Sequence, residues 1–178
     1  MYYAHLLSEI VFVMGLPGAG KSTWVSHNLK GFGIIDPDRI KRRHPLYNPH
    51  RPQLIHRWSK DIAARLYLNV LHMRVGRWVV VGIGSDADEM IFNMQAAQAA
   101  GFATRLVYVK CTLEKALARN GQRARQLPAE LVAAKAARLD GSFNLTALYA
   151  NFVNEVDNNV DLARYKQFVP APYKQRAN

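Results

Sequence analysis

Residues 15–23 read Gly-Leu-Pro-Gly-Ala-Gly-Lys-Ser-Thr, with the spacing Gly-x-x-x-x-Gly-Lys-Ser of a phosphate-binding loop. The apolar run at 10–14, Ile-Val-Phe-Val-Met, predicts a buried strand before the loop, and residues 23–30 can form a helix after it. In this context the backbone N–H groups turn toward a polyphosphate at a helix N-terminus, where the helix dipole favours anions. The alternative is a glycine-rich turn that only joins a strand to a helix. The fixed positions of the motif, together with its place between a strand and a helix, make that alternative less favoured.

This loop predicts binding of ATP and Mg²⁺. The Lys21 side chain would contact the β- and γ-phosphates, and the Ser22 hydroxyl would ligate the metal. The predicted nucleotide contacts from the loop are Gly15, Pro17, Gly18, Ala19, Gly20, Lys21, Ser22 and Thr23.

Length and composition indicate one domain over residues 1–178, because 178 residues with 49% hydrophobic residues suit a single well-buried core. The net charge of +11 implies an anionic partner, which could be a nucleotide, a sugar nucleotide or nucleic acid. The single cysteine, Cys111, excludes a disulfide framework, so a cytoplasmic location is expected. No apolar run approaches the ~18 residues of a membrane span, and no membrane partner is expected. The tail at 165–178 is expected to be flexible.

Strand-like and helix-like segments alternate along the chain, which predicts an α/β domain with a mostly parallel sheet of five strands. After the first strand, further strands are expected at residues 31–36, 78–83, 104–109 and 153–158. Apolar residues recur every four positions after Pro52 and predict the inward face of a long helix ending near Gly76, namely Leu54, Trp58, Ile62, Leu66 and Val70. Two successive helices are expected near the end, the second covering 143–152.

Two acidic residues, Asp36 and Asp38, follow the second predicted strand. Carboxyl ends of parallel strands face the ligand crevice, so both side chains are expected beside the phosphate loop. Asp38 could simply cap the helix predicted at 39–43. A carboxylate next to ATP can also accept the proton that a substrate hydroxyl loses on attack, and Asp38 is therefore the candidate catalytic base.

The stretch from Arg39 to Lys60 contains no acid and seven basic residues, and its three prolines indicate a rigid loop. A solvated charged face is one interpretation, and a pocket for an anionic substrate is the other. The predicted substrate-binding residues are Asp36, Lys41, Arg42, Arg43 and Arg51. The histidines in this stretch lack metal-ligand spacing and are not expected to bind a metal.

Residues 119–128 are the second candidate for chemistry and are expected to form a lid over ATP. Arg119 and Arg123 are four residues apart and share a helical face, while Arg125 lies in a loop closed by Pro128. Guanidinium groups suit phosphate oxygens, so all three arginines are predicted nucleotide contacts, and Arg119 and Arg123 are also predicted to act in catalysis. An exposed arginine-rich helix end is the alternative.

These pieces occur in an order that resembles the zeta toxin and polynucleotide kinase branch of the P-loop kinases. The resemblance rests on residues 15–23, Ile-Ile-Asp-Pro-Asp-Arg-Ile-Lys at 34–41, His44-Pro45, Trp58-Ser59, Gly84-Ser85-Asp86 and the arginines of 119–128. It implies a three-layer P-loop NTPase domain with an arginine-bearing lid, Asp38 as general base, and Lys41 as a basic substrate contact. Zeta toxins imply a UDP-activated amino sugar as acceptor, and polynucleotide kinases imply a nucleic-acid 5′-hydroxyl. An antitoxin-like protein partner stays open.

The chain departs from the family pattern at the end of the third predicted strand. Val81-Gly82-Ile83-Gly84 stands where the family has an acid followed by Gly-Thr-Gly. The carboxylate and the hydroxyl are both lost, and Asp36 or Asp38 would have to serve in their place. The sequence therefore favours an ATP-dependent kinase of an anionic small molecule, with a polynucleotide 5′-kinase or a catalytically silent nucleotide-binding module as alternatives.

Overall fold

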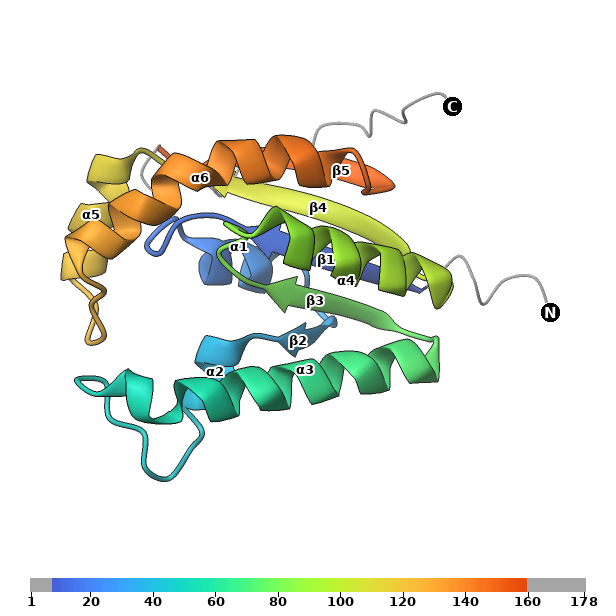
Figure 1. Cartoon of the computed structure of the whole chain (residues 1–178), viewed down its shortest axis with the longest axis horizontal. Helices are drawn as coiled ribbons and strands as arrows, with labels where there is room; N and C mark the ends of the chain where they lie inside the picture. The colour runs from blue at the N-terminus through green and yellow to red at the C-terminus, as the bar shows by residue number, and fades with distance from the viewer. Residues whose placement is uncertain (1–7, 160–178) are drawn as a thin grey trace.

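The computed structural model describes residues 8–159, which form one five-stranded sheet (Figure 1). The strands are β1 (Glu9–Met14), β2 (Gly33–Ile35), β3 (Arg77–Val81), β4 (Ala103–Lys110) and β5 (Phe152–Asp157). Their order is β2-β3-β1-β4-β5, and every pairing is parallel. The predicted α/β fold with a five-stranded parallel sheet is confirmed.

Helices join the strands on both faces of the sheet. They are α1 (Lys21–Asn28), α2 (Pro37–Lys41), the 3₁₀ helix η2 (Pro52–Ile55), α3 (His56–Met73), α4 (Ala87–Ala99), α5 (Leu113–Gly121) and α6 (Ala129–Ala147). The connection from β1 to β2 crosses the sheet in the opposite direction to the later connections. Right-handed crossovers therefore place α1 on one face and α3, α4 and α6 on the other, which gives three layers. Contacts between α4 and α6 agree with this arrangement.

Strand β1 is the centre of the core, because it pairs with β3 on one side and β4 on the other. Residues 10–14 are each at most 1% exposed, which explains why this stretch is a continuous apolar run without alternation. Val13 is in register with both Val81 and Val107. Strands β1 and β3 therefore end within one residue of each other, β4 continues to Lys110, and the loops that follow them leave the same edge of the sheet. No helix within residues 8–159 is long and apolar enough to cross a membrane.

The predicted inward face of α3 is correct at Val70, which is buried, but wrong toward the start of the helix. Leu54, just before α3, is 70% exposed, and Leu66 is 40% exposed, whereas Ser59, Ala63, Tyr67 and Val70 are the buried residues of the helix. Tyr67 makes this rotation favourable, since its ring packs edge-on against Phe12 and its hydroxyl donates to the Asn93 carbonyl at 2.5 Å.

The two helices predicted before the last strand are one helix in the structure. Helix α6 runs through Gly141 to Ala147, and β5 begins at Phe152 within the stretch predicted as helix. Gly141 lies in open space, so a glycine there neither breaks packing nor ends the helix. The assignment of residues 1–178 to one domain stays a prediction, and the tail at 165–178 lies outside the described residues.

The cap of α2 is Asp36 and not Asp38. The Asp36 carboxylate accepts a hydrogen bond from the Asp38 amide at 2.8 Å, and Pro37 occupies the first helical position. Asp38 therefore lies in the first turn of the helix, and its side chain is available for other contacts.

We expect Asp36→Ala to lower the free energy of unfolding by about 1 kcal/mol, because the helix loses its N-cap. Asp36→Asn should change it less, since asparagine caps equally well. Urea denaturation of the two variants measures the difference. Equal losses in both variants would show that the carboxylate charge matters and the cap does not.

Candidate nucleotide and acceptor site

The phosphate-binding loop lies between β1 and α1 and is held in shape by its own lysine. The Lys21 ammonium donates to the carbonyl oxygens of Gly15 and Leu16 at 2.7 and 2.8 Å. Gly18 has φ +89°, and a Cβ there would lie 2.4 Å from the Ala116 carbonyl oxygen, so only glycine fits this close approach to α5.

The charge on Lys21 is only partly compensated. Burial, followed by the charge of Arg123, lowers the pKa of Lys21 to about 8. Asp36 and Asp38 act in the opposite direction but do not restore the usual value. An anionic ligand in the loop would supply the missing negative charge, which is the electrostatic condition for binding phosphate.

Asn158, directly after β5, joins the last strand to this loop and was missed by sequence reasoning. Its side-chain amide donates to the Ala19 carbonyl at 2.5 Å, and its backbone N–H donates to the Lys110 carbonyl at 2.8 Å. The Asn158 carbonyl accepts from the Arg119 guanidinium at 3.2 Å, which places that lid arginine beside the loop. The only available signal was a polar residue at the carboxyl end of a predicted strand.

A cavity of about 410 Å³ lies next to the loop and brings several predicted site residues together. Its lining residues are Ser22, Val25, Ser26, Ile34, Asp36, Arg39, Arg42, Arg43 and Val81. Of the predicted substrate-binding residues, Asp36, Arg42 and Arg43 line it together with Ser22. Arg39 lines it too, although it was not among the predicted residues. Val81 lines the cavity, so the position that lacks the family's acid presents an apolar side chain to the site.

The predicted substrate contacts Lys41 and Arg51 do not line this cavity. Arg51 is exposed and precedes η2, where its N–H donates to the Asn48 carbonyl at 3.1 Å. Lys41 is 1% exposed, and its ammonium lies 3.5 Å from Asp38 Oδ1 and 3.1 Å from His56 Nδ1. The structure thus places Lys41 beneath Asp38 and not on the cavity surface.

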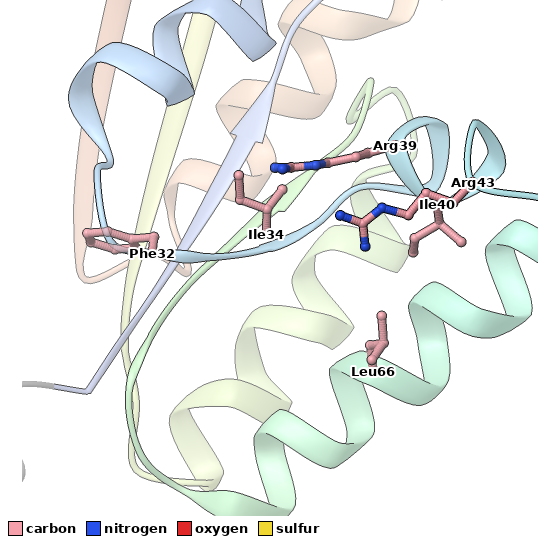
Figure 2. A pocket seen from close by; sticks show the side chains of 6 residues that line it. All are labelled: Phe32, Ile34, Arg39, Ile40, Arg43 and Leu66. Atoms are coloured by element: carbon pink, nitrogen blue, oxygen red, sulfur yellow. The ribbon is translucent and has the colours of Figure 1, made fainter.

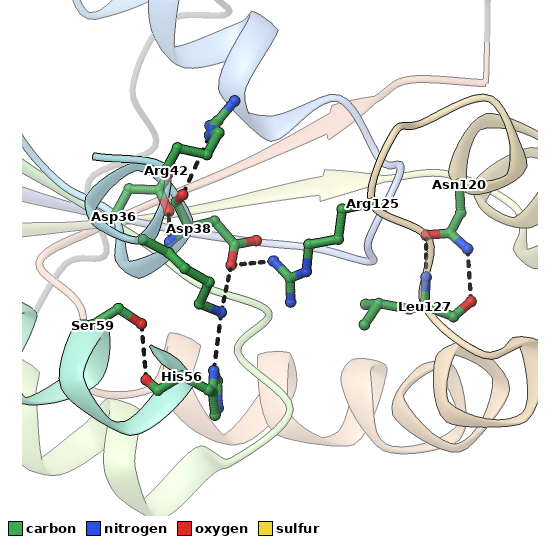
Figure 3. A network of polar contacts seen from close by, with 9 residues as sticks. Asp36, Asp38, Arg42, His56, Ser59, Asn120, Arg125 and Leu127 are labelled. Atoms are coloured by element: carbon green, nitrogen blue, oxygen red, sulfur yellow. Dashed lines mark hydrogen bonds and ion pairs between the residues drawn. The ribbon is translucent and has the colours of Figure 1, made fainter. Parts of the chain in front are cut away.

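Asp38 is bound by cations from two elements (Figure 3). Its Oδ1 accepts from Arg125 of the lid at 2.5 Å and lies 3.5 Å from the Lys41 ammonium of its own helix. Burial alone would raise the pKa of Asp38, but the charges and hydrogen bonds of Arg125 and Lys41 outweigh it and hold this pKa below its usual value. Asp38 is therefore ionised at neutral pH. In contrast, burial raises the pKa of Asp36 above its usual value.

The lid loop that carries Arg125 is closed by Asn120, which is 4% exposed at the end of α5. Asn120 donates to the Leu127 carbonyl at 2.9 Å and accepts from the Leu127 amide at 3.2 Å, as Figure 3 shows. This pair of hydrogen bonds fixes the ends of the loop. Arg123 is exposed in the same loop, near enough to Lys21 to lower its pKa.

Within residues 8–159, no three His, Cys, Asp or Glu side chains cluster as a metal site. Cys111 is half-buried, and burial raises the pKa of its thiol, which disfavours the reactive thiolate form.

Comparison with known proteins identifies the family. The model of the AAA domain family matches residues 10–145. The chain belongs to this family. The match covers the phosphate-binding loop, both aspartates and the lid, whereas Asn158 lies beyond its end. No curated protein is significantly similar to the chain in sequence.

Solved structures share the fold of this AAA domain at low sequence identity. A chain from the PezAT chromosomal toxin–antitoxin system of Streptococcus pneumoniae has a TM-score of 0.67 and 17% identity, over 93% of this chain and 74% of that chain. The AvrRxo1-ORF1:-ORF2 structure with ATP has a TM-score of 0.70 and 16% identity, over 85% of this chain and 55% of that chain. A gluconokinase from Sinorhizobium meliloti 1021 has a TM-score of 0.53 and 18% identity, over 88% of this chain and 86% of that chain.

These likenesses confirm the predicted P-loop kinase fold of the zeta toxin type at the level of fold. They leave the roles of individual residues as predictions.

We expect Arg125→Gln to raise the pKa of Asp38, because burial then acts against fewer compensating charges. ¹³C NMR titration of the carboxyl group measures the shift. A carboxylate with a lowered pKa stabilises the fold above the unfolded pKa of about 3.9, and this contribution is lost as the pH falls through the folded value. The stability difference between wild type and Arg125→Gln should therefore shrink below about pH 4.

Arg57→Gln is the matched control, since Arg57 is exposed on α3. An unchanged Asp38 titration in Arg125→Gln would mean that the ion pair does not form in solution.

We expect His56 to make stability depend on pH. Its Nδ1 lies 3.1 Å from the Lys41 ammonium and must accept from it, so the ring is neutral. Burial, then Lys41, Lys60 and Arg125, lower the pKa of His56, while Asp38 raises it. Below the unfolded pKa of about 6.5, the unfolded chain binds more protons than the folded one. Wild type should therefore lose stability on acidification through this window.

His56→Asn should remove this pH-dependent loss of stability. It should keep a hydrogen-bond acceptor for Lys41, because an amide oxygen takes the place of Nδ1. Unfolding curves between about pH 5.5 and 7.5 span the relevant window. His72→Asn, at the exposed end of α3, should retain the wild-type pH dependence. Identical pH curves for wild type and His56→Asn would contradict the Lys41 contact.

Proposed function

We propose that this protein is an ATP-dependent kinase that transfers the γ-phosphoryl group to a hydroxyl of an anionic small molecule. The observation that carries the proposal is the shared cavity in which Ser22, from the phosphate loop, faces Asp36 and three arginines. It offers an acceptor with negative charge a place beside the triphosphate. The resemblance of the chain to zeta toxins implies that the acceptor is a UDP-activated amino sugar.

The proposed roles follow from the geometry. Lys21 exchanges its loop carbonyl partners for the β- and γ-phosphates, and the Ser22 hydroxyl would hold Mg²⁺. Mg²⁺ would neutralise charge on the phosphates when bound. The lid arginines Arg119, Arg123 and Arg125 face the charge that spreads over the moving phosphoryl group.

Asp38 receives the proton of the acceptor hydroxyl. Both cations bind its Oδ1, and no described residue hydrogen-bonds its Oδ2, which leaves that oxygen to act as the base. As the O–H bond breaks, the acceptor oxygen bonds to the γ-phosphorus and the bond to the leaving ADP oxygen breaks. Because its pKa is lowered, Asp38 is a weak base that stays ionised over a wide pH range.

Two other functions have specific support. A catalytically silent nucleotide-binding module is favoured by Val81, which gives the cavity an apolar wall where the family has an acid. A polynucleotide 5′-kinase is favoured by the net charge of +11. We also propose a cytoplasmic location, and an antitoxin-like partner on the analogy of the PezAT toxin–antitoxin system.

Label transfer from ATP to panels of UDP-sugars and oligonucleotides tests the function. We expect transfer to a small anionic acceptor, loss of transfer in Lys21→Ala, and a decrease of about 10²–10⁴-fold in Asp38→Asn with unchanged ATP affinity. Asp61→Asn, an exposed acid on α3, is the matched control and should keep wild-type transfer.

Binding without transfer to any acceptor would favour the silent module. Transfer to a 5′-hydroxyl, with affinity falling by about 0.7 log units per log unit of salt for each of several phosphates, would favour the polynucleotide kinase.

A further inference from the structure

A second cavity of about 360 Å³ adjoins the first at the free edge of the sheet (Figure 2). It is lined by Phe32, Ile34, Arg39, Ile40, Arg43 and Leu66. Ile34, Arg39 and Arg43 line both cavities. The two cavities are therefore neighbouring parts of one groove, which begins at Ser22 and ends over Leu66 of α3.

Two arginine side chains project into this groove where the cavities meet. Figure 2 shows the guanidinium groups of Arg39 and Arg43 on the same side of α2, near Ile34. Within residues 8–159 neither has an acidic partner, and no acid lines the second cavity. Arg42, by comparison, donates to the Asp38 carbonyl at 3.3 Å. A pair of guanidinium groups without a counterion is suited to one phosphate or carboxylate.

The remaining wall of the second cavity is hydrocarbon. Phe32 and Ile34 lie on the same face of the β2 segment, and Ile40 and Leu66 close the cavity from α2 and α3. The Phe32 ring is fixed by the Arg77 guanidinium, 4.9 Å from its centroid. Among the described residues, no neutral polar side chain lines the cavity, so none of them can pair with the edges of a nucleobase. Leu66 is 40% exposed because it faces this cavity and not the core.

We propose that the second cavity binds the hydrocarbon part of an amphipathic anion whose phosphate or carboxylate is held by Arg39 and Arg43. The acceptor would then be an alcohol bearing an anionic group with an alkyl or aryl body beyond it, which departs from the UDP-activated amino sugars that the resemblance to zeta toxins implies. The hydroxyl would lie in the first cavity, the anion at the arginine pair, and the apolar body over Leu66. The identity of this ligand as the acceptor and the placement of its hydroxyl rest on the proposed kinase function, whereas the binding of an amphipathic anion does not.

The test compares two probes that share an anion and differ in hydrocarbon length, methyl phosphate and n-hexyl phosphate. Each is titrated into the full chain without ATP, and the dissociation constant is read from amide shifts in ¹H–¹⁵N NMR spectra. We expect n-hexyl phosphate to bind at least about tenfold more tightly, since each buried methylene adds to affinity. The largest shifts should occur at Ile34 and Ile40.

Matched variants separate the two halves of the site. Leu66→Ser should raise the dissociation constant of n-hexyl phosphate by about 3- to 10-fold and leave that of methyl phosphate unchanged, because only the apolar wall is altered. Leu68 lies two positions further along α3 and is 63% exposed, so Leu68→Ser should change the affinity for neither probe. Arg39→Gln and Arg43→Gln should lower the affinity for both probes equally.

Equal affinity for the two probes, or binding that is insensitive to Leu66→Ser and to both arginine variants, would overturn the proposal. These measurements require no phosphoryl transfer. A catalytically silent protein would therefore refute the kinase function without affecting this test, and an active kinase with no chain-length preference would refute only the amphipathic acceptor.

Discussion

The pairing of β1 with β3 and β4 determines where the candidate functional groups of this protein lie. Because the three strands run parallel and in register, their carboxyl ends form one edge, and the phosphate loop begins there. The amide of Gly15 continues the β3 pairing by donating to the Ile83 carbonyl at 3.0 Å. Both aspartates follow β2 at the same edge, and the lid follows β4 through α5. A change in strand order would separate these groups completely.

Positive charge is concentrated at this edge, and the protein holds it there at an electrostatic cost. Burial and the charge of Arg123 lower the pKa of Lys21, and among residues 8–159 neither Arg39 nor Arg43 forms an ion pair. Asp38 is the exception, since it neutralises cations from α2 and from the lid at once. Phosphate-bearing ligands would relieve the remaining repulsion. Ligand binding should therefore stabilise the fold as well as occupy the site.

Much of the fold was predictable, because the phosphate loop, the apolar strands and the two aspartates are local patterns. The α3 face was not, since apolar residues cover more than half of that helix and periodicity cannot tell a core-facing leucine from a cavity-facing one such as Leu66. The contacts of Asn158, Asn120 and His56 were also out of reach. Asn158 and His56 pair with residues 139 and 15 positions away, and Asn120 pairs with the backbone of Leu127 across the lid loop, and no spacing in the sequence encodes these contacts.

The hydrogen bond from Asn158 to the Ala19 carbonyl spans 139 positions of the chain. During synthesis the phosphate loop leaves the ribosome long before the residue that braces it. A nascent chain that ends before residue 158 can carry the whole glycine-rich motif and still lack this brace. The loop therefore acquires its full set of contacts only when translation has passed β5.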